Sequence, residues 1–341
     1  AIERAKSRFA ASAAGVEEVV LEVLAQAELS YWQVSRWQEQ LELNNSNLEV
    51  AETLLEEARE REKVGMATNI EVLQAEAFRA ESKEQIIEST RELGDAYDRL
   101  LAIMGILPDS AYGIDPDRGV EFMGESGTFM PEFEIAVQTA IERDPSLEAQ
   151  SLLIEQRRWD KVSAQNSMRP NLDLVVAGAY SGVDTESAPD AYSNALERDG
   201  HFWSVGLEFS MPWNNRQDKA NLRIAEREVD RELLRYDELK QDLYRTVRSS
   251  WRALDAVRQS LEAAQLTVSL QEATFEREKS KYEQGLSAFR DVLESQRDLD
   301  QARGRLLNAK LSRLSAEIEL SRLMGILFER NQISPELPEV N

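Results

Sequence analysis

The chain has 341 residues, of which 42% are hydrophobic and 30% charged, with only 15 Gly and 9 Pro. This composition is typical of long amphipathic helices rather than of a compact α/β enzyme. The 40 basic and 63 acidic residues give a net charge of −23, which argues against a nucleic-acid partner. Cys is absent and His201 is the single histidine, so disulfides, thiolate nucleophiles and multi-His metal sites are excluded. We therefore expect no catalytic residue, no metal and no cofactor.

The first predicted element is a very long helix over residues 1 to about 62. It contains one Gly and no Pro, and its apolar residues recur at helical spacing. At 1.5 Å per residue it would extend for about 90 Å, which indicates a coiled coil. Gly65 then predicts a left-handed stop, and Thr68 with Glu71 predicts a capping box. A second helix should run from there to about Ile103.

The middle of the chain changes period. A Gly-, Pro- and Asp-rich connector is followed by a helical region from Glu132 to about Gln165, with a break at Asp144-Pro145-Ser146. Strict alternation then predicts two strands, over Asn171–Gly182 and Phe202–Pro212. About ten residues is the length of a tilted strand that crosses a bilayer.

Aromatic residues stand near the ends of both predicted strands, where a membrane-interface girdle would lie: Tyr180, Trp203 and Trp213. The polar, acidic loop Val183–Gly200 would then be external. A soluble β-ribbon with one face packed on a helix is the alternative. Two strands cannot close a barrel, so a membrane hairpin would need strands from other copies or from another part of the protein.

The last third of the chain repeats the first with an offset of 220 residues. Gly65 matches Gly285, and the run Met104–Leu107 matches Met324–Leu327. The second copy therefore predicts a helix from about 217 to 282 and another from about 288 to 324. Residues 131 to 220, roughly, have no counterpart in the first copy, and the chain begins at Ala1 without an initiator Met or a signal peptide. We expect that the corresponding N-terminal helix and β-hairpin of the first repeat were removed or never included.

Two stretches of the second copy carry a family resemblance. They are Tyr282-Glu283-Gln284-Gly285-Leu286-Ser287 and Asp291-Val292-Leu293-Glu294-Ser295-Gln296, echoed by Val64-Gly65 and Glu71–Glu76. With Arg143–Ala149 and Arg169–Leu172, these segments resemble the outer-membrane efflux protein family, the TolC-like ducts of tripartite pumps and type I secretion systems. The resemblance implies a homotrimer with a shared β-barrel and a long helical tunnel.

The fold implied by this resemblance is mainly α with a small β part. Long antiparallel α-helical hairpins in two internal repeats would form the tunnel, and a transmembrane β-hairpin would contribute to a trimeric β-barrel. The expected division is residues 1–107 for the first-repeat hairpin, 108–131 for a connector, 132–169 for a helix of the second repeat, 170–213 for the barrel hairpin, 214–327 for the second-repeat hairpin and 328–341 for a tail.

The resemblance also implies a pore constriction lined by acidic side chains just after each turn, here Asp291, Glu294 and Glu71. A ring of carboxylates repeated by trimer symmetry would favour cations, and divalent cations could block it. The alternative role of each is to complement a helix N-terminus. The turns themselves, with Gly65, Thr68, Gly285 and Ser287, would meet a periplasmic adaptor or an inner-membrane pump, or they could simply end the helices.

The predicted function is a passive exit duct of an efflux or type I secretion system, and not an enzyme. It would lie in the outer membrane of a Gram-negative bacterium, with most of the chain in the periplasm. Its expected partners are two further copies of itself, a periplasmic adaptor (membrane fusion protein), an inner-membrane pump and outer-membrane lipid. The alternative from another class is a soluble coiled-coil scaffold or adaptor.

Overall fold

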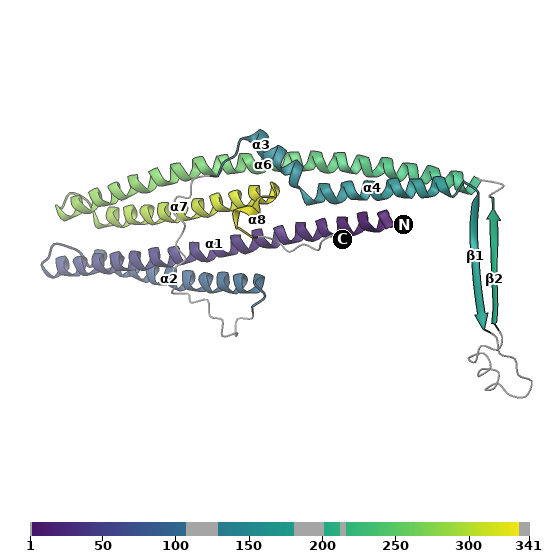
Figure 1. The fold of residues 1–341 in the computed structure, drawn as a ribbon. Helices are drawn as coiled ribbons and strands as arrows, with labels where there is room; N and C mark the ends of the chain where they lie inside the picture. The colour runs from purple at the N-terminus through teal and green to yellow at the C-terminus, as the bar shows by residue number, and fades with distance from the viewer. Residues whose placement is uncertain (1, 107–128, 181–200, 212–215, 334–341) are drawn as a thin grey trace, which may run out of the picture. The chain divides into compact units, whose positions relative to one another are not determined.

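The computed structural model describes residues 2–106, 129–180, 201–211 and 216–333. These residues divide into two compact units, one built from 2–11 and 149–237 and the other from 12–148 and 238–333. The elements (Figure 1) are α1 (Ile2–Lys63), α2 (Asn69–Ile103), α3 (Phe133–Arg143), α4 (Pro145–Asn166), β1 (Asn171–Tyr180), β2 (His201–Ser210), α6 (Arg216–Glu283), α7 (Phe289–Leu323) and α8 (Leu327–Arg330). The predicted fold class, mainly helical with one small β part, is confirmed. Within the described residues, no helix combines the length and apolarity needed to span a membrane.

The internal repeat is visible in the helix boundaries. The helices α1 and α6 end at Lys63 and Glu283, and α2 and α7 end at Ile103 and Leu323. Each pair keeps the offset of 220 residues that the sequence predicts. Figure 1 shows that in each copy the second helix, α2 or α7, runs back beside the first, α1 or α6, from the turn that joins the two. Both copies are therefore helical hairpins, as predicted.

Glycines end all four of these long helices in the same way. Gly65 and Gly285 both have φ of +74°, a left-handed conformation that most side chains disfavour. The amide of Met66 donates to the carbonyl of Arg61, and that of Leu286 to Lys281, each at 2.8 Å. With the bonds from the glycine amides to the carbonyls of Glu62 and Tyr282, each at 2.9 Å, they form Schellman caps that satisfy the last helical carbonyls. The predicted left-handed stops are confirmed.

The capping box predicted at Thr68 is wrong. The Thr68 hydroxyl makes no bond to the backbone of the first turn of α2 and instead donates to a Glu71 carboxylate oxygen at 3.4 Å. The other oxygen of Glu71 accepts a hydroxyl from the second repeat, which turns the carboxylate away from the cap. In the second copy the equivalent acid does reach back, because the amide of Ala288 donates to Asp291 at 3.4 Å.

The larger unit has a core built from both repeats. Ala51, Leu54 and Ala58 of α1 and Val72, Ala75 and Phe78 of α2 pack in one cluster with Phe275, Tyr282, Phe289, Val292, Leu293 and Leu299 of α6 and α7. Each large apolar side chain that is fully buried contributes about 1.5–3 kcal/mol. The four helices next to the two turns therefore form one packed bundle and not two independent hairpins.

A second contact in this unit sets the end of α7 against α3. Gly325 has φ of +65°, and a Cβ at that position would lie 3.0 Å from both Cβ and the carbonyl oxygen of Arg143. The equivalent Gly105 also has positive φ, +69°, but nothing lies within 4 Å of its Cβ position. The same turn is thus crowded in one repeat and open in the other.

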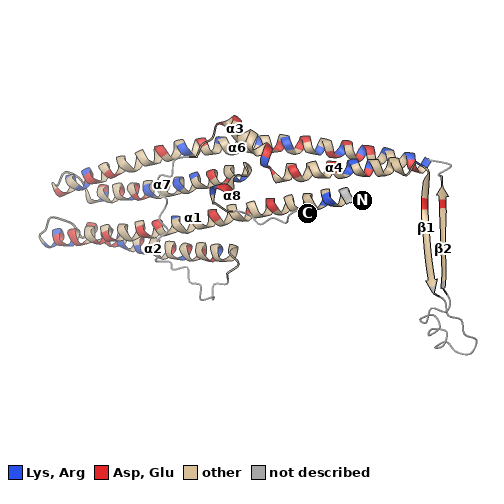
Figure 2. Ribbon diagram, viewed as in Figure 1, with Lys and Arg blue, Asp and Glu red and all other residues tan. Residues whose placement is uncertain are grey.

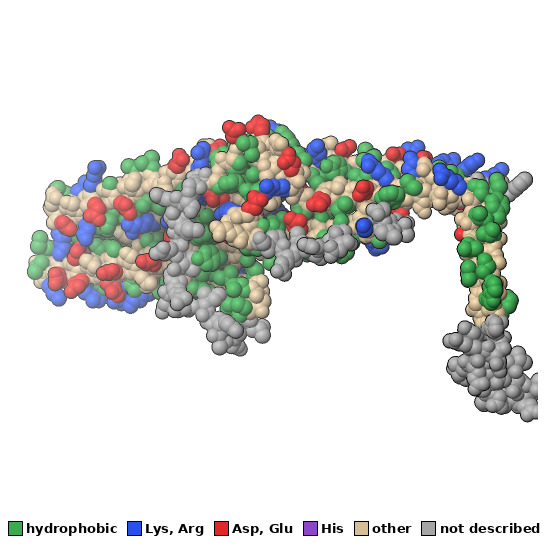
Figure 3. All heavy atoms as spheres, in the orientation of Figure 1, with side chains coloured by type: hydrophobic (Ala, Val, Ile, Leu, Met, Phe, Trp, Pro, Cys, Tyr) green, Lys and Arg blue, Asp and Glu red, His purple; other side chains and the backbone are tan. Residues whose placement is uncertain are grey.

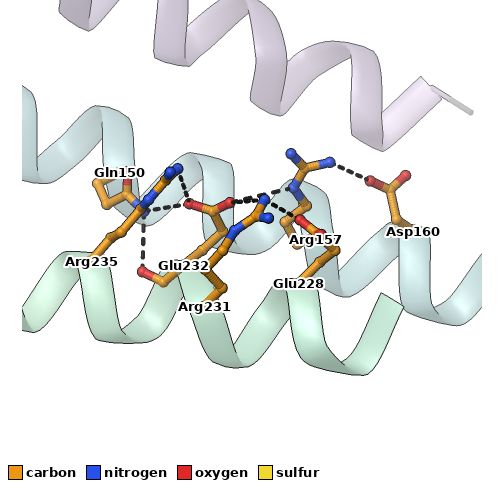
Figure 4. Close-up of polar contacts among 7 residues, drawn as sticks. All are labelled: Gln150, Arg157, Asp160, Glu228, Arg231, Glu232 and Arg235. Atoms are coloured by element: carbon orange, nitrogen blue, oxygen red, sulfur yellow. Dashed lines mark hydrogen bonds and ion pairs between the residues drawn. The ribbon is translucent and has the colours of Figure 1, made fainter. Parts of the chain in front are cut away.

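The smaller unit is held by a buried carboxylate. Glu232 of α6 has no exposed side-chain surface, and Figure 4 shows three arginines converging on it. The nitrogens of Arg231, Arg235 and Arg157 lie 3.1, 3.3 and 3.9 Å from its oxygens. Gln150 of α4 also donates to the carboxylate at 3.2 Å and to the Glu232 carbonyl at 3.1 Å. This network fixes α4 against α6.

Candidate functional site

The two hairpin turns are joined by a contact between the repeats. Tyr282, in the last turn of α6, donates its hydroxyl to Glu71 of α2 at 3.2 Å. Arg61 of α1 places its guanidinium carbon 4.4 Å from the centre of the Tyr282 ring and donates to the Tyr282 carbonyl at 3.3 Å. Burial and the charge of Glu71 raise the pKa of Tyr282, so its hydroxyl stays a hydrogen-bond donor at neutral pH.

The acidic residues that follow the second turn differ from Glu71 in their hydrogen bonds and exposure. The carboxylate of Asp291 accepts from the Ala288 amide and from the Ser287 hydroxyl, each at 3.4 Å. The single Ser287 proton is shared with Glu278 of α6, the nearer acceptor at 3.0 Å, and hydrogen bonds from Lys281 and Ser287 lower the pKa of Glu278. Glu294 is exposed, one turn along α7. Glu294 thus keeps an accessible carboxylate, whereas one oxygen of Asp291 accepts hydrogen bonds and the other lies 3.7 Å from Arg290, and both oxygens of Glu71 are bound by hydroxyls.

Arg61 is not among the site residues predicted from the sequence, and Tyr282 is predicted only as part of the family motif. A comparison of the two repeats would have pointed to Tyr282, because the residues at its position differ in character. Tyr282 and Phe289 pack ring to ring, with centroids 5.4 Å apart, and their counterparts Glu62 and Asn69 form a hydrogen bond of 3.2 Å instead. An apolar pair that replaces a polar pair at the same two positions indicates that the second turn packs against a neighbour.

Apolar side chains project from the turns. Val64, Met66 and Ile70 at the first turn are 65–71% exposed, and Leu286 at the second is 73% exposed. Such residues are unfavourable in water and favourable in a protein interface. Gly65, Thr68 and Gly285 lie exposed among them, and Ser287 is half-buried. The turns therefore present an exposed surface of backbone and apolar side chains.

The strand pair has two chemically different faces. The antiparallel register sets Leu172 opposite Phe209, Leu174 opposite Leu207, Val176 opposite Val205 and Gly178 opposite Trp203, so these residues share one face. The other face is mixed: it carries small and polar side chains, including Asp173 directly opposite Glu208, together with Val175 and Phe202. Figure 2 shows these two acids as the charged residues of the pair, and Figure 3 shows hydrophobic side chains along it.

Every strand side chain that is described on these two strands is exposed, on both faces. On the apolar face, Trp203 and Leu207 are each 72% exposed and Leu172 is 63% exposed. A soluble ribbon packed on a helix would bury one face, so that alternative is wrong for the described residues. A continuous exposed apolar face indicates contact with lipid or with another protein.

The three predicted interface aromatics are placed unequally. Trp203 lies on the apolar face near the start of β2. The backbone of Tyr180 ends β1, paired with His201. Trp213 lies outside the described residues, as do the loop Val183–Gly200 and most of the connector 108–131.

Comparison with protein families matches residues 1–106 and 136–326 to the family described as outer membrane efflux protein. The chain belongs to this family. The match includes both repeats and the strand pair, and the family's description is that of an efflux protein rather than an enzyme. The predicted family resemblance is confirmed.

Individual family members are distant in sequence and similar in fold. The outer membrane efflux protein BepC of Brucella suis biovar 1 (strain 1330) is 21% identical over 238 residues, which are 70% of this chain and 48% of BepC. The chain thus spans about half the length of this curated relative. Among solved structures, a membrane protein from Pseudomonas aeruginosa is similar with a TM-score of 0.77 and 18% identity, over 95% of this chain and 70% of that one. The CmeC outer membrane channel of Campylobacter jejuni is similar with a TM-score of 0.74 and 17% identity, over 94% of this chain and 66% of the other.

Proposed function

We propose that this protein is the outer-membrane exit duct of a tripartite efflux or type I secretion system. The observation that carries the proposal is the strand pair. Ten-residue strands with one largely apolar face, exposed from Leu172 to Gly178 and from Trp203 to Phe209, have the length and pattern of barrel strands in a bilayer. Membership of the outer membrane efflux protein family supports the same placement.

In this proposal the apolar face of the pair contacts lipid and the other face a water-filled lumen. Asp173 opposite Glu208 fits the lumen, because two like charges side by side are tolerated only where water solvates them. The open edges of both strands must be paired, since unpaired backbone groups are not tolerated in lipid. Three copies of the protein would supply the other strands, with Tyr180, Trp203 and Trp213 at the membrane interfaces.

The long hairpins would form the periplasmic tunnel, and their turns its tip. We assign Asp291 and Glu294 to the constriction because both acids follow the second turn, where Asp291 is half-buried and Glu294 is exposed. Glu71 is assigned to the same region, but its carboxylate already accepts hydrogen bonds from Tyr282 and Thr68. In a trimer these acids form rings that favour cations and bind divalent ions.

The exposed residues at the two turns indicate which partners the duct would bind. The apolar side chains around Gly65 and Gly285 would dock a periplasmic adaptor, or the inner-membrane pump that drives transport, with Thr68 and Ser287 beside them. The duct itself would be passive and carry out no catalysis. A soluble coiled-coil scaffold is a weaker candidate because it has no use for an exposed apolar strand pair.

Conductance across a planar lipid bilayer tests the proposal. The native full-length protein, purified in detergent, should migrate as a trimer and form cation-selective channels that divalent cations block. Replacing Asp291 by Asn and Glu294 by Gln together should weaken both the selectivity and the block. Glu276→Gln, an exposed acid of α6, is the matched control and should change neither. A monomer without conductance would contradict the proposed duct. Equal effects of the Asp291 and Glu294 double variant and of Glu276→Gln would contradict the proposed constriction.

A further inference from the structure

The end of α4 and the first turns of α6 carry a group of basic side chains next to the strand pair. Residues 161–169 and 216–223 together contain five basic residues and one acidic residue, although the whole chain has a net charge of −23. The ion pair between Lys161 and Glu226, at 3.3 Å, sets the end of α4 beside the start of α6. Figure 2 shows basic side chains in both of these places. The local charge is therefore opposite in sign to that of the chain.

Three of these residues share one face of α6. Arg216, Lys219 and Arg223 are spaced by three and four positions, which places them on one side of the helix. All three are exposed, and none forms a salt bridge with a residue that the structure describes. Arg223 donates to the Lys219 carbonyl at 3.3 Å, which leaves its charge uncompensated. By contrast, the next basic residue on this face, Arg227, pairs with Asp230 at 3.5 Å.

Neither helix packing nor helix stability accounts for this basic face. α4 packs on another side of α6, where Leu222 and Val229 are half-buried and Glu226 forms its ion pair. Arg216 and Lys219 lie in the first turn of α6, at the end of the helix dipole that disfavours cations. The face therefore favours a negatively charged ligand from outside the described part of the chain.

Chain connectivity places the basic group at the membrane surface in the proposed duct. Arg169, which is exposed, precedes Leu172 of the apolar strand face by three positions, or at most about 11 Å of extended chain. α6 begins at Arg216, six positions after β2 ends at Ser210. The headgroup layer on each side of a bilayer is about 5–8 Å thick, and the long side chains of Arg and Lys reach into it. The basic group would therefore lie at the depth of the lipid phosphates.

We propose that Arg169, Arg216, Lys219 and Arg223 bind the phosphate of an anionic phospholipid in the periplasmic leaflet of the outer membrane. The inference rests on the duct proposed above. A phosphodiester presents two charged acceptor oxygens, and one guanidinium can donate to both. The acyl chains of the lipid would continue along the apolar strand face from Leu172. A lipid whose headgroup also carries a cation would bind less tightly, because its net charge is zero.

Calorimetric titration of the full-length protein in a non-ionic detergent tests the site. The titrants are dihexanoyl-phosphatidylglycerol, whose headgroup is negative, dihexanoyl-phosphatidylcholine, whose headgroup has no net charge, and inorganic phosphate as a free anion. We expect saturable binding of the phosphatidylglycerol, about tenfold or more tighter than that of the phosphatidylcholine and weakened by NaCl because the cations are exposed. Equal binding of the two lipids would overturn the inference. Phosphate binding as tight as that of the phosphatidylglycerol would also overturn it, in favour of a free anion.

A triple variant removes the basic face of α6. Arg216→Gln, Lys219→Gln and Arg223→Gln together should weaken phosphatidylglycerol binding by about ten- to a hundredfold, since each cation near an anionic surface contributes about fivefold. Gln is a good helix former, so thermal unfolding of the variant should stay as in the native protein. Unchanged affinity in this folded variant would refute the site.

A second triple variant makes the same change of charge elsewhere on α6. Lys240→Gln, Arg248→Gln and Arg252→Gln remove three cations that are also exposed and that form no salt bridge with a described residue. They lie further from the strands along the helix, so this variant should bind phosphatidylglycerol as the native protein does. Equal weakening in both triple variants would mean that the lipid responds to overall charge, which would overturn the assignment to this face.

Failure of the lipid site can be told apart from failure of the duct. The basic face contains none of the constriction residues, so its triple variant should still form trimers and conduct ions with divalent block. Conducting native trimers without a preference for phosphatidylglycerol would refute the lipid site and leave the duct standing. A native protein that neither assembles nor conducts would refute both.

Discussion

The phenol oxygen of Tyr282 lies 3.2 Å from a carboxylate oxygen of Glu71, 211 positions away in the chain. This hydrogen bond joins the last turn of α6 to the first turn of α2, and so joins one repeat to the other. The Tyr282 ring is 7% exposed and packs between the guanidinium of Arg61 and the ring of Phe289. A movement that separates the two turns must break this set of contacts.

Tyr282→Phe removes the hydrogen bond and keeps both ring contacts. The expected loss of stability is about 0.5–1.5 kcal/mol, the net value of one such bond. If the turns form the tip of a tunnel, the variant should also open more often in bilayer recordings. Glu71→Gln retains an acceptor oxygen and should have a smaller effect on both. A Tyr282→Phe protein with unchanged unfolding and conductance would show that the bond does not restrain the tip.

The equivalent glycines Gly325 and Gly105 should differ in their response to alanine. Both have positive φ, so Ala costs about 1–2 kcal/mol at either position. Gly325→Ala adds a clash, because its Cβ would lie 3.0 Å from the backbone oxygen of Arg143. We expect a larger fall in thermal stability for Gly325→Ala, measured by circular dichroism. Equal falls would mean that α3 moves away freely.

Glu232→Gln should destabilise the protein by about 1–3 kcal/mol. It leaves three arginines without their shared carboxylate, although these arginines are partly exposed and water recovers some of the loss. Glu228→Gln, which breaks the ion pair of Arg231 with a more exposed acid, should cost under about 1 kcal/mol. Urea unfolding of both variants provides the comparison, and an equal cost would contradict a special role for burial.

The same carboxylate predicts a pH dependence. Burial acts to raise the pKa of Glu232, but hydrogen bonds from Gln150, Arg231 and Arg235, with the charge of Arg235, lower it below the ordinary value of 4.5. The unfolded chain therefore binds the proton more tightly, and stability falls as the pH drops below about 4.5. The stability difference between the native protein and Glu232→Gln should be constant at neutral pH and shrink in acid. A difference that grows in acid would reverse the assigned sign.

Adjacent residues of β2 offer a test of the membrane face. Val205 lies on the apolar face, opposite Val176, and Ser204 on the other, opposite Ala177. In the proposed duct, Val205→Arg would place a charge in the bilayer, at a cost of about 2–4 kcal/mol near its centre, and should reduce the trimer recovered from outer membranes. Ser204→Arg would point to the proposed lumen and should be tolerated. Equal recovery of both variants would argue against a lipid-facing side.

Local patterns were sufficient to predict most of the secondary structure. The helix ends at Lys63, Ile103, Glu283 and Leu323 follow from glycines that adopt positive φ, and the strand faces follow from alternation. The fold class could be predicted because each of these signals depends only on near neighbours in the chain. The capping box at Thr68 failed because Glu71 has a competing partner that is remote in sequence.

What the sequence determined by itself is the set of elements, their repeat and the face that each strand presents. Only the tertiary structure decided which side chains meet, such as Tyr282 with Glu71 and Glu232 with Arg157. Such pairs depend on the rotation and lateral position of separate helices. Helical periodicity says which face of a helix is buried and leaves open what that face contacts.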